Sequence, residues 1–201
     1  MNSEIIAIIP VLNPQGILID IVDNLIQSDF KHIIVVDDGS TENVEIFSTL
    51  RDRNGVVVLK HPVNLGKGRA LKTAFIYTLN HFSEYRGVIT IDADGQHKGT
   101  DIQKCADGFK SKCLDNRIIL GCRQFKDADR IPLRSRFGNF CTKYVLRYLC
   151  NIRVSDSQTG LRGIPMRMLL ELVKVLGEGY EYETNMLLEL IDRGGNFRST
   201  D

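Results

Sequence analysis

The sequence predicts an α/β domain in which a mainly parallel sheet is flanked by helices. Apolar segments of strand length alternate with amphipathic segments of helix length from residue 5 to residue 121. The first apolar segment, residues 5–9, is almost continuously aliphatic, which is typical of a strand that is covered on both faces. Alternation of this kind favours parallel strands that are joined by helical crossovers.

The spacing of apolar residues predicts each element in turn. Residues 17–27, for example, place Leu18, Ile21 and Leu25 on one face of a helix. The expected strands occupy residues 5–9, 32–36, 56–61, 88–91 and 118–120. The expected helices occupy residues 17–27, 66–79, 137–150, 166–176 and 182–193, and two more begin near residues 42 and 100. A short apolar stretch lies at 161–164, and a further strand is expected from residue 196.

Composition excludes several classes of protein. The chain has 201 residues, of which 43% are hydrophobic and 25% charged, as in an average folded domain rather than a disordered or fibrous chain. A formal net charge of +1 argues against non-specific nucleic-acid binding. The first four residues lack the basic region of a signal peptide. Five cysteines without a CxxC pair indicate reduced, buried thiols in the cytoplasm, and four scattered histidines argue against zinc.

Polar residues gather where the predicted strands end. The groups that follow these strands are Asn13, Asp37 with Asp38, Asn64, residues 92–94 and Arg123. In an open α/β sheet, ligands bind outside the carboxyl ends of the strands. The sequence therefore predicts one shared site at this edge of the sheet.

The segment after the fourth strand carries the most specific chemistry. If the chain leaves the strand still extended, Asp92, Asp94 and Gln96 share one face. Their oxygen atoms suit Mg²⁺ or Mn²⁺. Because the protein would supply only a few ligands, coordination positions remain for water and for phosphate oxygens. The alternative is a solvated turn without a ligand.

Two further segments each allow two interpretations. Asp37 or Asp38 is suited to accept hydrogen bonds from a nucleobase, or to cap the next helix, which Ser40 or Thr41 would do equally well. Residues 66–69 open a helix whose amino end is expected to approach a diphosphate, or they are only a basic helix start. They match neither a dinucleotide-binding nor a P-loop motif.

At this point the chain resembles the inverting, nucleotide-sugar-dependent glycosyltransferases of family 2, and most of all the dolichyl- and polyprenyl-phosphate sugar synthases. Eight motifs carry the resemblance in register, at residues 8–13, 34–41, 64–71, 92–97, 121–123, 134–139, 156–162 and 182–185. Two positions depart from the family pattern. Pro14 follows Asn13 where Glu is usual, which removes one polar contact to the nucleoside, and Gly95 stands where Leu is common.

The resemblance implies the GT-A fold, with a Rossmann-like, mixed and mainly parallel sheet, and it implies a role for each matching residue. The nucleotide would be bound by Pro10, Leu12, Val36, Asp38, Lys67, Asp92 and Ala93, with Asp38 facing the base and Asp92 at the ribose or base. Asp94 and Gln96 would hold Mg²⁺ or Mn²⁺ on the diphosphate, and Asp94 thereby acts in catalysis. The acceptor would be bound by Arg123, Arg134, Gln158 and Glu183.

The expected reaction is inverting transfer of a hexose from a nucleotide-diphosphate sugar to a polyprenyl phosphate. Such an acceptor is ionised at neutral pH and pairs well with arginine, so it needs no strong base. The alternative acceptor is a saccharide hydroxyl in cell-surface polysaccharide synthesis, which requires a carboxylate base, and Asp156 is the candidate. A basic surface is the alternative for Arg123 and Arg134.

Two other classes of protein remain open at this point. A haloacid-dehalogenase-type phosphatase would use Asp92 as nucleophile and Asp94 as acid/base. Three strand–helix units precede this loop, however, and the late Gly-Asp-x-x-x-Asp motif of that class is absent. A non-catalytic nucleotide-binding module is the other alternative.

The chain is expected to be one catalytic domain over residues 1–201, truncated at its C-terminus relative to longer relatives. Residues 1–123 would form the nucleotide-sugar half and residues 124–201 the acceptor half. No apolar run is long enough to cross a bilayer. The full-length protein is nevertheless expected at the cytoplasmic face of a membrane, with peripheral membrane contact and a homo-oligomeric state as further expectations.

Overall fold

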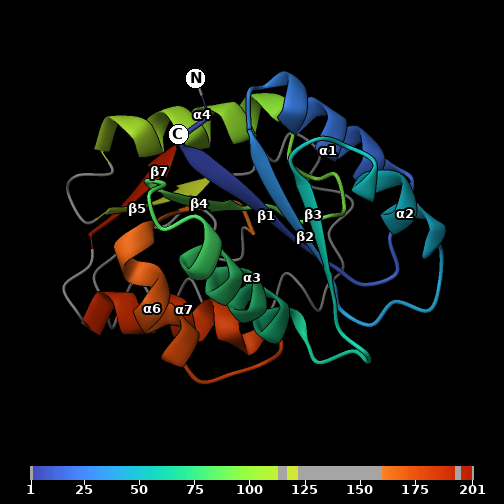
Figure 1. Ribbon diagram of the computed structural model, residues 1–201. Coiled ribbons are helices and arrows are strands. Elements are labelled where there is room, and N and C mark those ends of the chain that lie inside the picture. Colours follow the sequence, from blue (N-terminus) through green and yellow to red (C-terminus); the bar gives the residue numbers. More distant parts are fainter. Residues whose placement is uncertain (1, 113–116, 122–159, 193–195, 201) are drawn as a thin grey trace, which may run out of the picture.

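The computed structural model describes residues 2–112, 117–121, 160–192 and 196–200, and the described elements form one layered α/β unit (Figure 1). The strands are β1 (Ile5–Val11), β2 (His32–Asp37), β3 (Val56–Lys60), β4 (Gly87–Thr90), β5 (Arg117–Gly121), β6 (Arg162–Pro165) and β7 (Asn196–Thr200). The helices are α1 (Ile17–Gln27), α2 (Glu45–Arg51), α3 (Lys67–His81), α4 (Gly99–Lys112), α6 (Met166–Lys174) and α7 (Glu181–Asp192).

The strands form a seven-stranded sheet in the order β3-β2-β1-β4-β6-β5-β7. The neighbours β3–β2, β2–β1, β1–β4 and β5–β7 pair in parallel, whereas β6 runs antiparallel to both β4 and β5. The sheet is therefore mixed and mainly parallel, as the sequence predicts. The stretch expected only to be short and apolar, residues 161–164, supplies the antiparallel strand.

Helices cover both faces of the sheet (Figure 1). Residues of α1, α2 and α4 pack with one face of the sheet, and residues of α3, α6 and α7 pack with the other. Within β1, Ile5, Ala7 and Ile9 belong to the first core, while Ile6 and Ile8 belong to the second. Successive side chains of a strand point to opposite faces, so a strand with two covered faces must be apolar throughout.

Most predicted elements lie within one or two residues of their observed bounds, and α1 matches its prediction, residues 17–27. The exception is α2, which begins at Glu45 behind Val44 rather than near residue 42, so neither Ser40 nor Thr41 caps it. Ser40 instead donates its N–H to Asp37 Oδ1 at 2.8 Å, which forms a turn directly after β2. Cys105 is fully buried, as expected. The helix expected at 137–150 lies outside the described residues.

None of the described helices is both long and apolar enough to cross a membrane.

The pairing of β4 with β6 leaves no room for a side chain at Gly87. A Cβ there would lie 2.2 Å from the carbonyl oxygen of Ile164 and 2.6 Å from Cζ of Phe109. At Gly99, the first residue of α4, a Cβ would meet nothing within 4 Å. We expect Gly87→Ala to lower the free energy of unfolding by about 1–3 kcal/mol, as overpacking does. Gly99→Ala should stay within about 0.5 kcal/mol of the wild type.

Urea denaturation of the two variants and the wild type measures this difference. A Gly87→Ala midpoint equal to that of Gly99→Ala would contradict the close pairing of β4 with β6.

Candidate functional site

A cavity of about 430 Å³ opens at the carboxyl ends of β1, β2 and β4. Its lining consists of residues 10–15, Asp38, Asn64, Gly66, Lys67, Ala70, residues 92–94, Gly179 and Tyr180. The structure thus brings together most of the polar groups that follow the predicted strands. Gly179 and Tyr180 come from the loop between α6 and α7, and the sequence had not indicated them.

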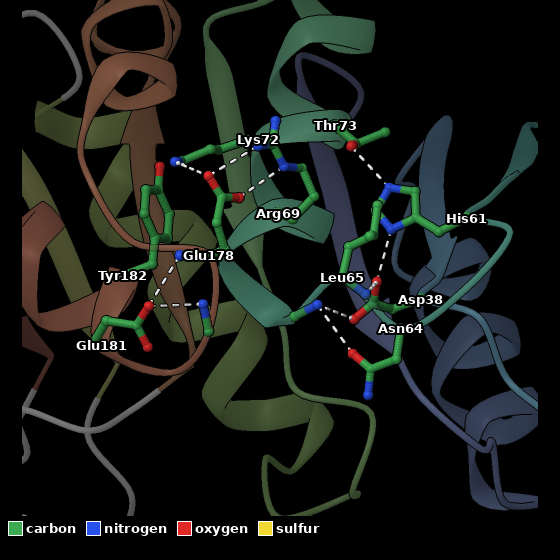
Figure 2. A network of polar contacts seen from close by, with 12 residues as sticks. Asp38, His61, Asn64, Leu65, Arg69, Lys72, Thr73, Glu178, Glu181 and Tyr182 are labelled. Carbon is green, nitrogen blue, oxygen red and sulfur yellow. Dashed lines mark hydrogen bonds and ion pairs between the residues drawn. The ribbon is translucent and has the colours of Figure 1, made fainter.

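Asp38 is built into the wall of this cavity. Its Oδ1 lies 2.7 Å from His61 Nδ1, and His61 Nε2 lies 2.9 Å from Thr73 Oγ1 (Figure 2). The backbone N–H groups of Leu65 and Gly66 donate to Oδ1 and Oδ2 of the same carboxylate at 3.0 and 2.8 Å. An ionised carboxylate only accepts hydrogen bonds, so His61 Nδ1 is the donor in this pair. Asp38 therefore holds the backbone directly before α3, and it also lines the cavity.

Asn13 joins the loop after β1 to the loop after β2. Its backbone adopts φ 52°. Its N–H donates to Ser40 Oγ at 2.9 Å, and its Oδ1 accepts hydrogen bonds from the N–H groups of Thr41 at 3.0 Å and Glu42 at 3.3 Å. An amide side chain is suited to this because asparagine tolerates positive φ and bonds nearby backbone groups. The rim of the cavity is thus held by Asn13 itself.

Lys67 and Asp92, which line the cavity, belong to a network of charged side chains that extends beyond the lining. Lys67 Nζ donates hydrogen bonds of 2.7 Å to both Asp92 Oδ1 and Glu183 Oε2. Arg162 Nη1 lies 3.4 Å from Glu183 Oε1, and His97 Nε2 lies 4.0 Å from Asp92 Oδ2. These five side chains come from distant parts of the sequence. Sequence reasoning singled out Lys67, Asp92 and Glu183 separately but not their contact.

The pKa values of the central pair follow from this arrangement. Burial alone would lower the pKa of Lys67, but the carboxylates of Glu183 and Asp92 outweigh it, so the pKa is raised. Burial alone would raise the pKa of Asp92, but the Lys67 ammonium, with smaller contributions from His97 and Arg162, lowers it. Both groups are therefore charged at neutral pH.

Gly160 allows the chain to approach Asp92. A Cβ on Gly160 would lie 2.1 Å from Asp92 Oδ1. Thr90 Oγ1 donates a 2.7 Å hydrogen bond to the carbonyl oxygen of Gly160, which holds the backbone in place. Only glycine fits here without moving the Asp92 carboxylate away from Lys67.

The turn after β4 places one of the two predicted metal ligands, but not the other, in the lining of the cavity. Asp94 lines the cavity, but Gln96 is exposed and lies outside the lining. The chain turns at residues 93–95, Gly95 has φ +73°, and Gln96 N–H donates to Asp94 Oδ1 at 3.0 Å. The extended conformation expected for residues 92–96 is therefore wrong, because Gly95 permits a turn that a leucine would disfavour.

Two N–H groups in the first turn of α3 are already occupied by another loop. Gly68 N–H donates to the Gly179 carbonyl oxygen at 3.2 Å, and Arg69 N–H donates to the Glu178 carbonyl oxygen at 3.0 Å. The first N–H groups of a helix lack partners within the helix, and here another loop supplies them. The N–H groups of Gly68 and Arg69 are therefore not available to a diphosphate, and an approach of residues 66–69 to such a group stays a prediction.

The remaining predicted residues divide into three groups. Pro10, Leu12 and Ala93 line the cavity with Lys67 and Asp92. The side chain of Val36 is fully buried in the core under α3, because it points to the sheet face away from Asp37, so its expected contact with a nucleoside is corrected. Four predicted residues lie outside the described part of the chain: Arg123, Arg134, Asp156 and Gln158.

Comparison with known proteins identifies the family. The model for Glycosyl transferase family 2 matches residues 6–171. The UDP-N-acetylglucosamine–dolichyl-phosphate N-acetylglucosaminyltransferase of Methanococcus voltae is 29% identical over 200 residues, 91% of this chain and 77% of that protein. The dolichyl-phosphate beta-glucosyltransferase of Saccharomyces cerevisiae is 25% identical over 179 residues, 78% of this chain and 51% of that protein.

A solved structure supports the same fold. Glucosyl-3-phosphoglycerate synthase from Mycobacterium tuberculosis, crystallised with Mn²⁺, UDP and phosphoglyceric acid, superimposes with a TM-score of 0.69 at 20% identity, covering 97% of this chain and 67% of that chain. The family model covers most of the chain. The fold of the chain, and the cavity at the ends of its strands, agree with this family. The chain therefore belongs to glycosyl transferase family 2 and has the GT-A fold.

Proposed function

We propose that this glycosyltransferase moves a hexose, with inversion, from a nucleotide-diphosphate sugar to a polyprenyl phosphate. The observation that carries the proposal is the cavity, whose lining includes Asp92 and Asp94 after β4. The Lys67 ammonium pairs with Asp92. Two relatives support the acceptor, since the Methanococcus voltae and Saccharomyces cerevisiae enzymes are named for dolichyl phosphate. The family assignment removes the phosphatase alternative.

A divalent cation fits the residues present. Among the residues that the structure describes, no three His, Cys, Asp or Glu side chains form a complete metal cage. Mg²⁺ is commonly held by one or two carboxylates together with substrate phosphates and water, and Asp94 supplies a carboxylate in the cavity wall. The Mycobacterium tuberculosis synthase was crystallised with Mn²⁺ and with Mg²⁺, each beside UDP. Such a cation, when bound, would offset the charge that develops on the leaving diphosphate.

Lys67 makes the cavity acceptable to a dianionic ligand. Asp92 lines the cavity and Glu183 lies beside the same lysine, since Lys67 Nζ is 2.7 Å from a carboxylate oxygen of each. Without the ammonium these carboxylates would repel a diphosphate. With it, the ionised Asp92 is held in one orientation, in which it can accept hydrogen bonds from the hydroxyl groups of a ribose.

The proposed acceptor site uses the residues that the sequence predicts for it. Arg123 and Arg134 are proposed to bind the acceptor phosphate, and Gln158 is proposed to lie near the sugar and the acceptor. Glu183 is proposed to face the acceptor from α7, where Lys67 and Arg162 hold its carboxylate. A phosphate acceptor is already ionised, so Asp156 is needed as a base only if the acceptor is a hydroxyl. A lipid acceptor would bring the enzyme to the cytoplasmic face of a membrane; homo-oligomerisation stays a prediction.

Removing the Asp94 carboxylate should remove cation-dependent transfer. We expect Asp94→Asn to reduce transfer of the sugar about 100-fold or more, because stabilisation of the leaving group is lost. Labelled sugar incorporated into polyprenyl phosphate, measured over a Mn²⁺ titration, gives the rate. Asp107→Asn, an exposed carboxylate of α4, is the matched control and should keep the wild-type rate.

Wild-type Mn²⁺ dependence in Asp94→Asn would refute the assignment of Asp94. Transfer by the wild type to a saccharide hydroxyl but not to polyprenyl phosphate would refute the proposed acceptor.

Replacing Lys67 should shift the pH dependence of the reaction. In Lys67→Met the ammonium that lowers the pKa of Asp92 is gone, so this pKa rises and Asp92 becomes protonated at higher pH. The acid limb of the kcat/KM profile should therefore move to higher pH, and stability should fall by about 3 kcal/mol because a buried ion pair is broken. Lys67→Arg keeps the charge and should restore the acid limb.

A pH–rate profile of the three proteins, with urea denaturation to confirm folding, is the measurement. An acid limb that does not move in folded Lys67→Met would show that Asp92 is not the group that titrates.

A further inference from the structure

We propose that Tyr180 forms a wall of the nucleoside pocket by stacking on the base, and that the loop from residue 177 to residue 181 positions it there. The inference rests on the proposed function, since it requires a nucleoside diphosphate in the cavity. It assigns a donor contact to a residue outside all eight motifs of the sequence.

Tyr180 lines the cavity although it is one of the most exposed large side chains of the described residues. Its exposed fraction is 81%, and that of Leu176 in the same connection between α6 and α7 is 83%. Only Tyr180 of these two contributes to the lining. A tyrosine ring that is left out of the core but faces a cavity offers a large apolar surface to a ligand.

The lining of the cavity fits a flat, apolar ligand face near this ring. Pro10 and Leu12 supply further apolar surface, and Leu12 is 47% exposed. Asn64 adds an amide that can pair with the polar edge of a base. The carboxylates of Asp92 and Asp94 suit the ribose and the cation-bound diphosphate instead. The base is therefore the part of the donor that matches Tyr180.

The backbone of the loop is fixed to α3 next to Tyr180. The carbonyl oxygens of Glu178 and Gly179 accept the N–H groups of Arg69 and Gly68, at 3.0 and 3.2 Å. This approach depends on Gly66, where a Cβ would lie 2.3 Å from the carbonyl oxygen of Glu178. The residue before Tyr180 is thus held by the amino end of α3.

Two glutamates secure the same loop (Figure 2). The Glu178 carboxylate lies 2.7 Å from Arg69 Nε and 3.1 Å from the Nζ of the buried Lys72. Glu181 Oε1 accepts the N–H groups of Glu178 and Gly179, each at 3.0 Å. Tyr180 therefore stands between two anchored neighbours, Gly179 and Glu181. A ring whose backbone is fixed before binding loses little conformational entropy when a base stacks on it.

Binding of UDP and of GDP in the presence of Mn²⁺, measured by isothermal titration calorimetry, tests the stacking. For whichever nucleotide the wild type binds, Tyr180→Ala should weaken the affinity about 10-fold, as loss of one base–aromatic stack does. Tyr180→Phe keeps the ring and should retain wild-type affinity. Leu176→Ala, an equally exposed position directly before this loop and outside the cavity lining, is the matched control and should also bind as the wild type does.

The corresponding nucleoside monophosphate and nucleotide sugar separate the base from the rest of the donor. The same loss for all three ligands in Tyr180→Ala supports stacking on the base. A loss confined to the nucleotide sugar, or seen only as a higher KM for the acceptor, would overturn the inference, and so would unchanged affinity for every ligand. Failure of the wild type to bind any nucleoside diphosphate would instead overturn the proposed function itself.

Glu181 variants test the positioning. Glu181→Ala removes both hydrogen bonds to the loop and should weaken nucleotide binding several-fold, whereas Glu181→Gln keeps an acceptor oxygen and should restore it. In the Tyr180→Ala background, Glu181→Ala should cause no further loss, because the ring that it positions is already absent. Additive losses in the double variant would show that Glu181 acts on general stability and not through Tyr180.

Discussion

Lys67 is the cation on which the charged network at the cavity depends. It stands at the first turn of α3 and bonds carboxylates that follow β4 and that lie on α7. Burial alone would raise the pKa of Asp92, and the Lys67 ammonium lowers it instead. The ammonium therefore keeps Asp92 ionised, and its two hydrogen bonds join α3 to the segment after β4 and to α7. Loss of Lys67 leaves the Asp92 carboxylate without the cation to which it is hydrogen-bonded, which is costly for a group buried from water.

Much of the fold could be predicted because the sheet is covered on both faces. The aliphatic run of β1 and the helical spacing in α1 follow directly from that burial, and both elements begin where the sequence indicates. When both faces of a strand are covered by apolar side chains, the sequence does not show which face each residue of the strand points to. Asp37 and Asp38 are adjacent, and only Asp38 reaches the cavity, while Asp37 is 1% exposed and bonds the Ser40 N–H.

The site was predicted less completely, because local patterns do not reveal tertiary contacts. The spacing of Asp92 and Asp94 located the cavity, but the turn at Gly95 depends on a positive φ and removes Gln96 from it. The sequence predicted that the amino end of α3 approaches a phosphate group. Two of its N–H groups instead donate to carbonyl oxygens of a loop more than 100 residues later in the chain. Arg162 is 1% exposed, and its basic side chain gave no local sign of burial.

Residues 178–183 contact the first of the two expected halves of the domain. Residues 124–201 were expected to serve the acceptor, yet Tyr180 lines the same cavity as Pro10, and Glu183 bonds the lysine that bonds Asp92. The lining of the cavity is therefore complete only with the loop before α7 in place on α3. Because the loop occupies the N–H groups of α3, a displacement of the loop would both remove Tyr180 and free helix donors. Under the proposed function, the donor site and the carboxylate of Glu183 thus depend on one small set of contacts on α3.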